Sequence, residues 1–331
     1  MTESTYPSHP KPHIIISKCI EFDNCRYNGQ IIASDQIKEL MKYVSFQPVC
    51  PEVEIGLGIP RNSIRIILKD GKHCLYQPET HTDITAKMIS FTESFLQSLS
   101  DVDGFLLKSR SPSCGIKDVK VYPIGEKVSA IDKSPGFFGD KVLQHFSHVS
   151  IEDEGRLRNP SIREHFLRTI FTYARFREVK KKQSLSDLIT FHANHKFMFM
   201  AYKQQGLKQL GRIVANQENL DSKLLINQYE TMLHKIFSKA PRCTSNINVL
   251  MHAYGYFKKD VSKKEQLFFL SLLDDYRDGK QSLASVVSVL KSWIIRFDQE
   301  YLQQQYFFSP YPDALLHPQD IDACSSKNYW K

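Results

Sequence analysis

The sequence predicts an α/β N-terminal domain with a Rossmann-like, open and mostly parallel sheet, followed by an all-α C-terminal helical domain. The chain has 331 residues, which suits two domains at roughly 100 to 200 residues each. In the first half short β-branched runs alternate with helical patterns, whereas the second half has long helical patterns and few strand signals. A polar stretch with a glycine and a proline separates them, so we expect domains at residues 12–150 and 151–331.

The first half contains five apolar runs of strand length and two helical patterns. The runs are rich in Val, Ile and Phe, and lie at residues 12–17, 45–50, 63–70, 102–109 and 119–123. Apolar residues at three-and-four spacing predict helices at residues 34–44 and 83–99. This alternation is typical of an α/β sheet.

The second half predicts a helical bundle. Its amphipathic patterns lie at residues 160–182, 184–204, 219–239, 245–257, 263–278 and 282–296.

Composition excludes several classes of protein. Apolar residues make up 41% and charged residues 24% of the chain, which argues against wholesale disorder. No run approaches the roughly 18 apolar residues that span a bilayer, and the first dozen residues lack a secretory signal pattern. We therefore expect a cytoplasmic protein with no membrane partner.

Charge is uneven along the chain. Up to Ser150 there are 17 Lys and Arg against 17 Asp and Glu, whereas the remainder holds 27 against 19, so the net charge of +8 comes from the second half. Either a polyanionic partner or a solvated basic surface explains this excess.

Three of the seven cysteines follow predicted strands. Cys19, Cys50 and Cys114 come after the first, second and fourth apolar runs, and the carboxyl ends of strands in open α/β sheets form a common crevice. Three thiols there predict a metal site. The role of Cys25 stays open, and we expect Cys74, Cys243 and Cys324 to be small buried residues.

The residues around these cysteines resemble a known family. The segments KCIEFDNCRYNG, CPEVEIGLGIPR and LKSRSPSCG are similar to the signatures of the TudS thiouracil desulfidase family. The segments FHANHKFMFMAYKQQGLKQLGR, NVLMHAYGYFKK and YLQQQYFFSPYP are similar to the YbgA-type helical domain. This fusion resembles the tRNA 4-thiouridine desulfidases sometimes called RudS. The first segment departs from the family pattern at Ile20 to Asn24.

The resemblance implies a cofactor and catalytic residues. It implies a 4Fe-4S cluster held by Cys19, Cys50 and Cys114, with one iron left open for a thione sulfur, and it implies Glu52 and Ser111 as catalytic residues. Such a cluster would act as a Lewis acid without net electron transfer.

Three further residues are expected to bind the substrate. Lys108 and Arg61 are nearby cations, and Ser113 lies beside the third cysteine. Ser111, Ser113 and Glu52 can also be read as ordinary loop residues.

Basic clusters in the second half mix Lys and Arg with aromatic residues, as RNA-binding surfaces do. The candidate RNA-binding residues are Lys180, Lys181, Lys182, Lys196, Lys258 and Lys259. The alternative is the polar face of amphipathic helices. His192 and His195 share one helical face, where they suit a phosphate contact or helix packing better than a metal.

These observations support three functional hypotheses. The first is an iron–sulfur enzyme that converts 4-thiouridine in tRNA to uridine and releases sulfide. The second is desulfidation of free thiouracil or a thiopyrimidine nucleotide such as 4-thio-UMP. The third is a non-catalytic RNA-binding protein with structural zinc. The sequence does not determine the oligomeric state.

Overall fold

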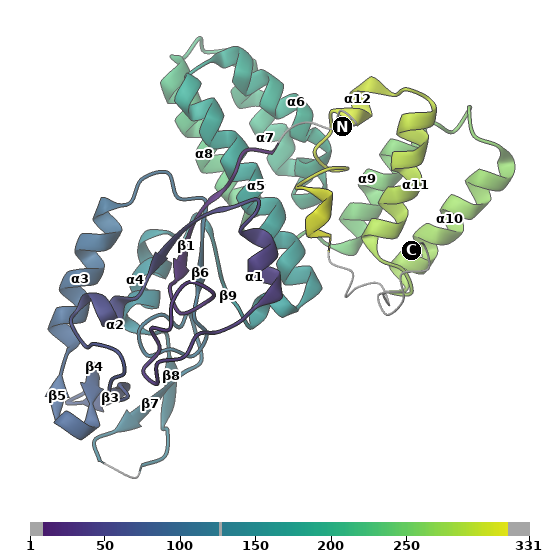
Figure 1. Cartoon of the computed structure of the whole chain (residues 1–331). Coiled ribbons are helices and arrows are strands. Elements are labelled where there is room, and N and C mark those ends of the chain that lie inside the picture. Colours follow the sequence, from purple (N-terminus) through teal and green to yellow (C-terminus); the bar gives the residue numbers. More distant parts are fainter. Residues whose placement is uncertain (1–8, 126–127, 317–331) are drawn as a thin grey trace. The chain divides into compact units, whose positions relative to one another are not determined.

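The computed structural model describes residues 9–125 and 128–316. The chain forms two compact units, residues 11–174 and residues 175–331 together with residues 1–10. We call them the α/β unit and the helical unit (Figure 1). The long helix α5 (Pro160–Lys182) contributes to both. The boundary expected at Ser150 stays a prediction.

The α/β unit contains a four-stranded parallel sheet in the order β2-β1-β6-β9. Its strands are β1 (His13–Ser17), β2 (Ser45–Val49), β6 (Gly104–Leu107) and β9 (Ser150–Asp153). Ile14, Ile15 and Ile16 of β1 are all fully buried. A continuous apolar strand is expected where a parallel sheet is covered on both faces, so the predicted α/β class is confirmed.

Helices cover both faces of this sheet. Ile15 and Phe105 pack in one apolar cluster with Leu96 of α3 (Thr85–Ser98) and Phe138 of α4 (Phe137–His145). On β6, a Cβ added to Gly104 would lie 3.1 Å from the side chain of Ile170 in α5. The shorter helices are α1 (Asp35–Leu40) and α2 (Pro51–Glu54).

A second, five-stranded sheet has the order β5-β4-β3-β7-β8. Its strands are β3 (Arg65–Lys69), β4 (Lys72–Gln77), β5 (Thr82–Asp83), β7 (Val119–Pro123) and β8 (Asp132–Ser134). Only β3 and β7 pair in parallel. The Asp70–Gly71 turn between β3 and β4 has positive φ at both residues, as a tight hairpin requires. The five predicted strands are confirmed, but they are divided between two sheets.

The helical unit continues from α5 through a series of helices. These are α6 (Leu185–Tyr202), α7 (Gln204–Ala215), α8 (Ser222–Phe237), α9 (Cys243–Gly255), α10 (Lys263–Arg277), α11 (Leu283–Arg296) and α12 (Glu300–Gln303). The six predicted helices are confirmed. Helix α7 was not predicted, because only the extended backbone of Lys203 separates it from α6.

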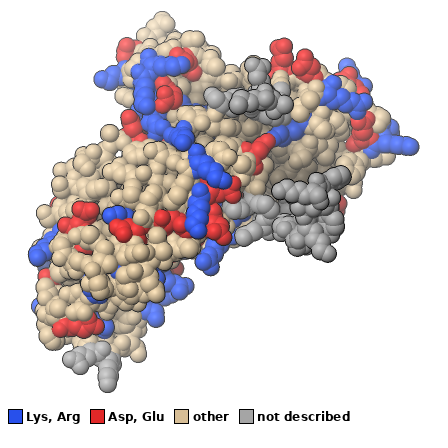
Figure 2. Space-filling model, in the orientation of Figure 1, with Lys and Arg blue, Asp and Glu red and all other residues tan. Residues whose placement is uncertain are grey.

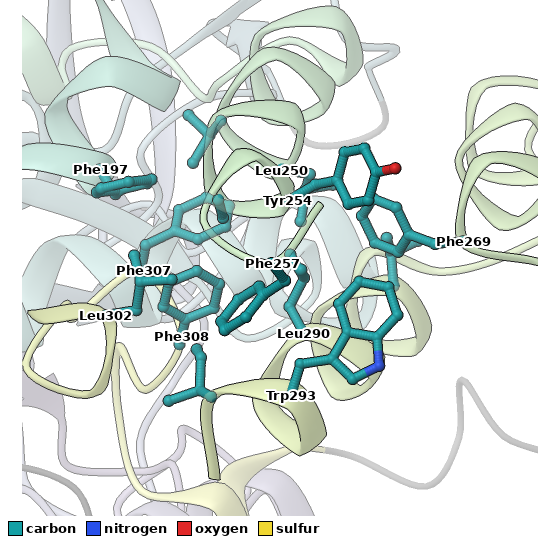
Figure 3. Close-up of a cluster of buried hydrophobic side chains, with 14 of the residues drawn as sticks. Phe197, Leu250, Tyr254, Phe257, Phe269, Leu290, Trp293, Leu302, Phe307 and Phe308 are labelled. Carbon is teal, nitrogen blue, oxygen red and sulfur yellow. The ribbon is translucent and has the colours of Figure 1, made fainter. Parts of the chain in front are cut away.

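An aromatic core holds the later helices together. Tyr254 and Phe257 of α9, Phe269 of α10 and Trp293 of α11 pack in one buried cluster, together with Phe197 of α6 (Figure 3). Burying such side chains stabilises a fold by roughly 1.5 to 3 kcal/mol each. Among the described residues, no helix combines the length and apolar character needed to span a membrane.

Candidate thiol-rich active site

The carboxyl ends of the four parallel strands carry the candidate site residues. Cys50 directly follows β2, Cys19 lies two residues after β1, and Cys114 lies in the loop after β6. Glu154 directly follows β9. Because parallel strands end at one edge of a sheet, these residues are brought to the crevice where open α/β sheets bind ligands.

The thiols interact with one another at this edge. The Cys25 thiol lies close enough to the thiols of Cys19 and Cys50 for both to shift its pKa. Cys50 Sγ lies 3.9 Å from the carbonyl oxygen of Cys25. Cys114 contacts the Ser17 hydroxyl and experiences the charges of Cys50 and Cys25. The structure thus groups the three predicted cysteines with Cys25.

Neighbouring thiols and burial raise the pKa of three of these cysteines. Contact with the Cys19 thiol is the largest effect that raises the pKa of Cys25, to about 11. The contact with Cys25, followed by burial, raises the pKa of Cys50. Burial raises the pKa of Cys114. Neighbouring thiolates repel in a poorly solvated place, so ionising these thiols together requires added positive charge.

The donor set fits an iron–sulfur cluster. In residues 9–125 and 128–316, no three His, Cys, Asp or Glu side chains are grouped closely enough to hold a single metal ion. Soft thiolates are the donors that such a cluster takes, and the cations of the cluster neutralise them.

Glu52 is held beside these thiols by two partners. It lies in the first turn of α2, which begins at Pro51 directly after Cys50. Arg61 donates to Glu52 Oε2 from Nε at 2.8 Å and from Nη2 at 2.6 Å. The Ser113 hydroxyl donates to Glu52 Oε1 at 2.7 Å. Charge-assisted hydrogen bonds of this kind fix a carboxylate in one orientation.

Arg61, which was expected to bind the substrate, is the partner of Glu52 in the structure. Its side chain is only 4% exposed. Its Nη1 also donates to the carbonyl oxygens of Cys25 at 3.0 Å and Gly58 at 3.1 Å. Arg61 therefore ties the carboxylate to the loop that carries Cys25.

Hydrogen bonds from the first residues of α4 fix the loop that carries Ser111 and Cys114. The amides of Phe137 and Phe138 donate to the carbonyls of Pro112 and Ser113 at 3.0 and 2.9 Å. A Cβ added to Gly139 would lie 2.3 Å from the Gly115 carbonyl oxygen. The helix can approach this closely only because residue 139 has no side chain.

Ser111 has one hydrogen-bonding capacity left for a ligand. Its Oγ accepts from the amides of Ser113 at 3.2 Å and Cys114 at 3.1 Å. A hydroxyl has two acceptor lone pairs and one proton to donate. Ser111 thus shapes the loop with its lone pairs and can offer its proton to a substrate.

Lys108, also expected to bind the substrate, is paired with Glu154. Lys108 Nζ donates to Glu154 Oε1 at 2.6 Å, and the Ser109 hydroxyl donates to the same oxygen at 2.7 Å. The Lys108 amide donates to the Ser17 hydroxyl at 2.9 Å. Sequence reasoning missed Glu154, because the polar segment before it forms a strand only by pairing with β6.

We expect Glu154→Gln to lower the free energy of unfolding by about 2 to 4 kcal/mol, because it leaves Lys108 without its anion. Burial raises the pKa of Glu154, but the contacts with Lys108 and Ser109 outweigh it and lower the pKa. The stabilisation is therefore full above the unfolded-state pKa of about 4.3 and is lost as pH falls through the lower folded-state pKa. Denaturant unfolding at neutral pH and at acidic pH measures it.

Glu93→Gln is the matched control. It breaks the Glu93–Lys141 ion pair, in which the Glu93 side chain is 50% exposed, and should cost no more than about 1 kcal/mol. Equal losses in the two variants would contradict a supporting role for Glu154.

The predicted RNA-binding lysines have different environments. Lys180 pairs with Glu230 at 2.7 Å, Lys181 with Glu178 at 3.1 Å and Lys182 with Asp187 at 2.8 Å. Lys258 and Lys259 are exposed in the turn after α9. Lys196 of α6 lies close enough to His192 to lower its pKa, although burial is the larger cause. On the visible face of the helical unit, basic and acidic side chains are interspersed (Figure 2).

His195 is a packing residue of the helical unit. It is fully buried, its Nε2 accepts from Arg175 Nε at 3.0 Å and its Nδ1 lies 2.7 Å from the Phe191 carbonyl oxygen. Its ring stacks on Tyr306 at 4.5 Å. His192 contacts the Tyr229 hydroxyl at 3.1 Å. A phosphate contact and helix packing were the two roles considered for His192 and His195. The structure shows the packing role for His195.

The fold and the site define an α/β unit with thiols and a fixed carboxylate at the sheet edge, joined to a helical unit. The family model described as 2-thiouracil desulfurase matches residues 14–154, and the model of DUF1722, a protein family of unknown function, matches residues 196–312. The chain belongs to the 2-thiouracil desulfurase family in its N-terminal part and to the DUF1722 family in its C-terminal part. The family supports an enzyme that cleaves a carbon–sulfur bond.

Individual proteins are similar to parts of the chain. The chain is 30% identical over 131 residues to the uncharacterized protein YbgA of Escherichia coli (strain K12), covering 39% of this chain and 76% of that protein. It is 31% identical over 111 residues to the uncharacterized protein YbbK of Bacillus subtilis (strain 168), covering 31% and 72%. A solved structure, the [4Fe-4S]-dependent thiouracil desulfidase TudS, is similar at 25% identity and a TM-score of 0.35, covering 45% of this chain and 94% of that one.

Proposed function

We propose that the protein is an iron–sulfur desulfidase that converts 4-thiouridine in tRNA to uridine and releases sulfide without net electron transfer. The observation that carries this proposal is the position of Glu52. It is fixed by Arg61 and Ser113 next to a group of thiols. A general acid–base group beside soft metal donors suits hydrolysis of a carbon–sulfur bond.

Cys19, Cys50 and Cys114 would hold the cluster, as the sequence resemblance implies. When bound, a 4Fe-4S cluster with three protein ligands supplies an iron that polarises a thione sulfur as a Lewis acid. The three cysteines come from three different strand ends. The sheet therefore sets their spacing before any cofactor is present.

Glu52 would move the proton of the attacking water. Arg61 and Ser113 orient the carboxylate, which accepts a proton as the water oxygen bonds to C4 of the pyrimidine. The proton then passes to the departing sulfur. Water supplies one oxygen and two protons, so the products are a carbonyl and hydrogen sulfide, and no reductant is needed.

Ser111 would donate to the substrate. Its Oγ accepts from the amides of Ser113 and Cys114. Its O–H group therefore remains to donate a hydrogen bond to a bound substrate. A pyrimidine carbonyl beside the site is a suitable acceptor. Lys108, paired with Glu154, fixes the start of the same loop.

The helical unit would supply the RNA contacts. The chain after Ser150 carries 27 Lys and Arg against 19 Asp and Glu, and phosphate contacts require such a surplus. The buried aromatic core argues that most aromatic residues of this unit hold the fold. The exposed lysines are therefore the candidate phosphate contacts, and Lys258 and Lys259 are an adjacent exposed pair.

A double substitution, Lys258→Glu with Lys259→Glu, should weaken tRNA binding by about 10-fold or more and reduce the salt slope by about 1 to 2, because each lost phosphate contact removes one released counterion. Filter binding at several salt concentrations measures both. Lys72→Glu with Lys87→Glu makes the same charge change on exposed positions of the α/β unit. Equal weakening by both pairs would contradict a localised contact.

Desulfidation of a free thiopyrimidine is the second candidate. All the site residues from Ser17 to Glu154 lie in the α/β unit, which favours chemistry that needs no helical unit. Incubating the reconstituted protein with thiolated tRNA and with 4-thio-UMP separates the two candidates. Loss of thionucleoside absorbance from tRNA at low concentration supports the first, and loss from the mononucleotide alone removes tRNA as the substrate.

A further inference from the structure

Cys25 occupies a position among the thiols that the proposed chemistry does not use. Its carbonyl oxygen lies 3.9 Å from Cys50 Sγ, and its thiol is close enough to the thiols of Cys19 and Cys50 for both to influence it. It is only 1% exposed. Two of the three residues assigned to the cluster are therefore direct neighbours of this fourth thiol.

Hydrogen bonds fix the backbone around Cys25, and its side chain lies among the thiols. Arg61 Nη1 donates to the Cys25 carbonyl at 3.0 Å, and the neighbouring Asp23 amide donates to the Lys18 carbonyl at 3.0 Å. Residues 23–25 themselves have no regular secondary structure. A side chain on such an anchored, irregular segment can change rotamer without unfolding a helix or a strand.

Cys25 differs from Cys114 in what surrounds it. Cys114 belongs to the apolar cluster that also contains Ile15 and Phe105. The neighbours of Cys25 include two thiols, and its carbonyl accepts from the guanidinium of Arg61. Its place beside two sulfur donors suits a role at the same metal centre.

We propose that Cys25 is a displaceable fourth thiolate of the cluster. It binds the iron left open by the other three cysteines when no substrate is present, and it yields that position to the substrate sulfur. The proposal rests on the proposed function. Four thiolates can bind the four irons of a 4Fe-4S cluster, one to each iron, and Cys25 is a buried cysteine beside Cys50.

The exchange is a substitution of one sulfur ligand by another. The Cys25 sulfur leaves the iron with the electron pair of the iron–sulfur bond and takes a proton from water. The substrate sulfur donates an electron pair to the same iron. No atom changes its oxidation state, so no oxidant or reductant is required.

A Cys25 thiolate bound to the open iron would compete with the substrate and raise its apparent dissociation constant. If the open form makes up about one tenth of the protein, the apparent dissociation constant rises about 10-fold over the intrinsic one. Removing the thiol should restore the intrinsic affinity. The cap would also shield the open iron from small soft ligands between turnovers.

The test compares wild type with Cys25→Ala and Cys25→Ser after anaerobic reconstitution, with Cys74→Ala as control. Cys74 lies on β4, outside this group of thiols, and is partly exposed. Mössbauer spectra of isotopically labelled iron report whether one iron differs from the rest. Visible titration with 4-thiouracil reports the dissociation constant.

We expect four similar iron sites in wild type and in the Cys74 variant, and one distinct site in both Cys25 variants. We also expect Cys25→Ala to bind 4-thiouracil about 10-fold more tightly. Unchanged spectra and affinity would overturn the proposal, and so would loss of the cluster from both Cys25 variants. If wild type holds no cluster, the proposed function fails as well. If wild type is active and the Cys25 variants have unchanged spectra and affinity, only the role of Cys25 fails.

Discussion

Glu52→Gln is expected to lower turnover by about 10²- to 10⁴-fold, the usual effect of a positioned acid–base group. The amide keeps the size of the side chain, and its one oxygen can still accept from Arg61 while its NH2 group donates to the Ser113 hydroxyl, but it cannot take a proton from water. We therefore expect kcat to fall much more than KM changes. Single-turnover assays under anaerobic conditions measure the loss.

The cluster and the fold should survive this substitution. Glu52 is not one of the thiol donors, so iron content and visible colour should match wild type. Glu54→Gln is the control, because Glu54 lies in the same short helix and is exposed. Full activity in Glu52→Gln, or equal loss in Glu54→Gln, would contradict the acid–base role.

Cys114→Ser is expected to lose most of its bound iron and to fall to background turnover. Cys114 is 6% exposed and packs among apolar side chains, and a hydroxyl is a harder and poorer ligand for iron than a thiolate. The broad absorbance of the cluster at about 400 nm should disappear. Iron analysis after anaerobic reconstitution measures the same change independently.

Cys74→Ser serves as the control for this loss. It removes one thiol from β4 of the second sheet and leaves the parallel sheet intact. It should retain iron and turnover. A Cys114→Ser protein that keeps wild-type iron content would remove Cys114 from the ligand set.

The strand ends that carry the cysteines were predictable because their signals are local. The run of Ile14, Ile15 and Ile16 is long and apolar enough to indicate a buried strand, and Cys19 follows it. The same holds for Cys50 after β2 and Cys114 after β6. The rule that ligands bind at the carboxyl ends of parallel strands then brings these residues together without any long-range information.

The supporting contacts were not predictable because they join distant parts of the chain. Glu154 follows β9, whose polar sequence resembles a linker and forms a strand only by pairing with β6. The contact between Ser113 and Glu52 crosses 61 positions in sequence. Cys25 lies in a loop without periodicity, so its approach to Cys19 and Cys50 depends on tertiary structure.

The second sheet was missed for a related reason. Its strand β4 mixes Lys, His and Gln with Leu and Tyr, so it lacks the apolar run that identified β1. It forms because the Asp70–Gly71 turn brings it antiparallel to β3.

Isotope-labelled water shows whether a protein with its cluster held by thiolates and with Glu52 as acid–base group hydrolyses a thione. Reconstituted protein would be incubated anaerobically with thiolated substrate in water enriched in heavy oxygen, with no electron donor. We predict one sulfide released for each thionucleoside consumed, with the heavy oxygen in the new carbonyl. Turnover that requires a reductant, or a product without the label, would contradict non-redox hydrolysis by water.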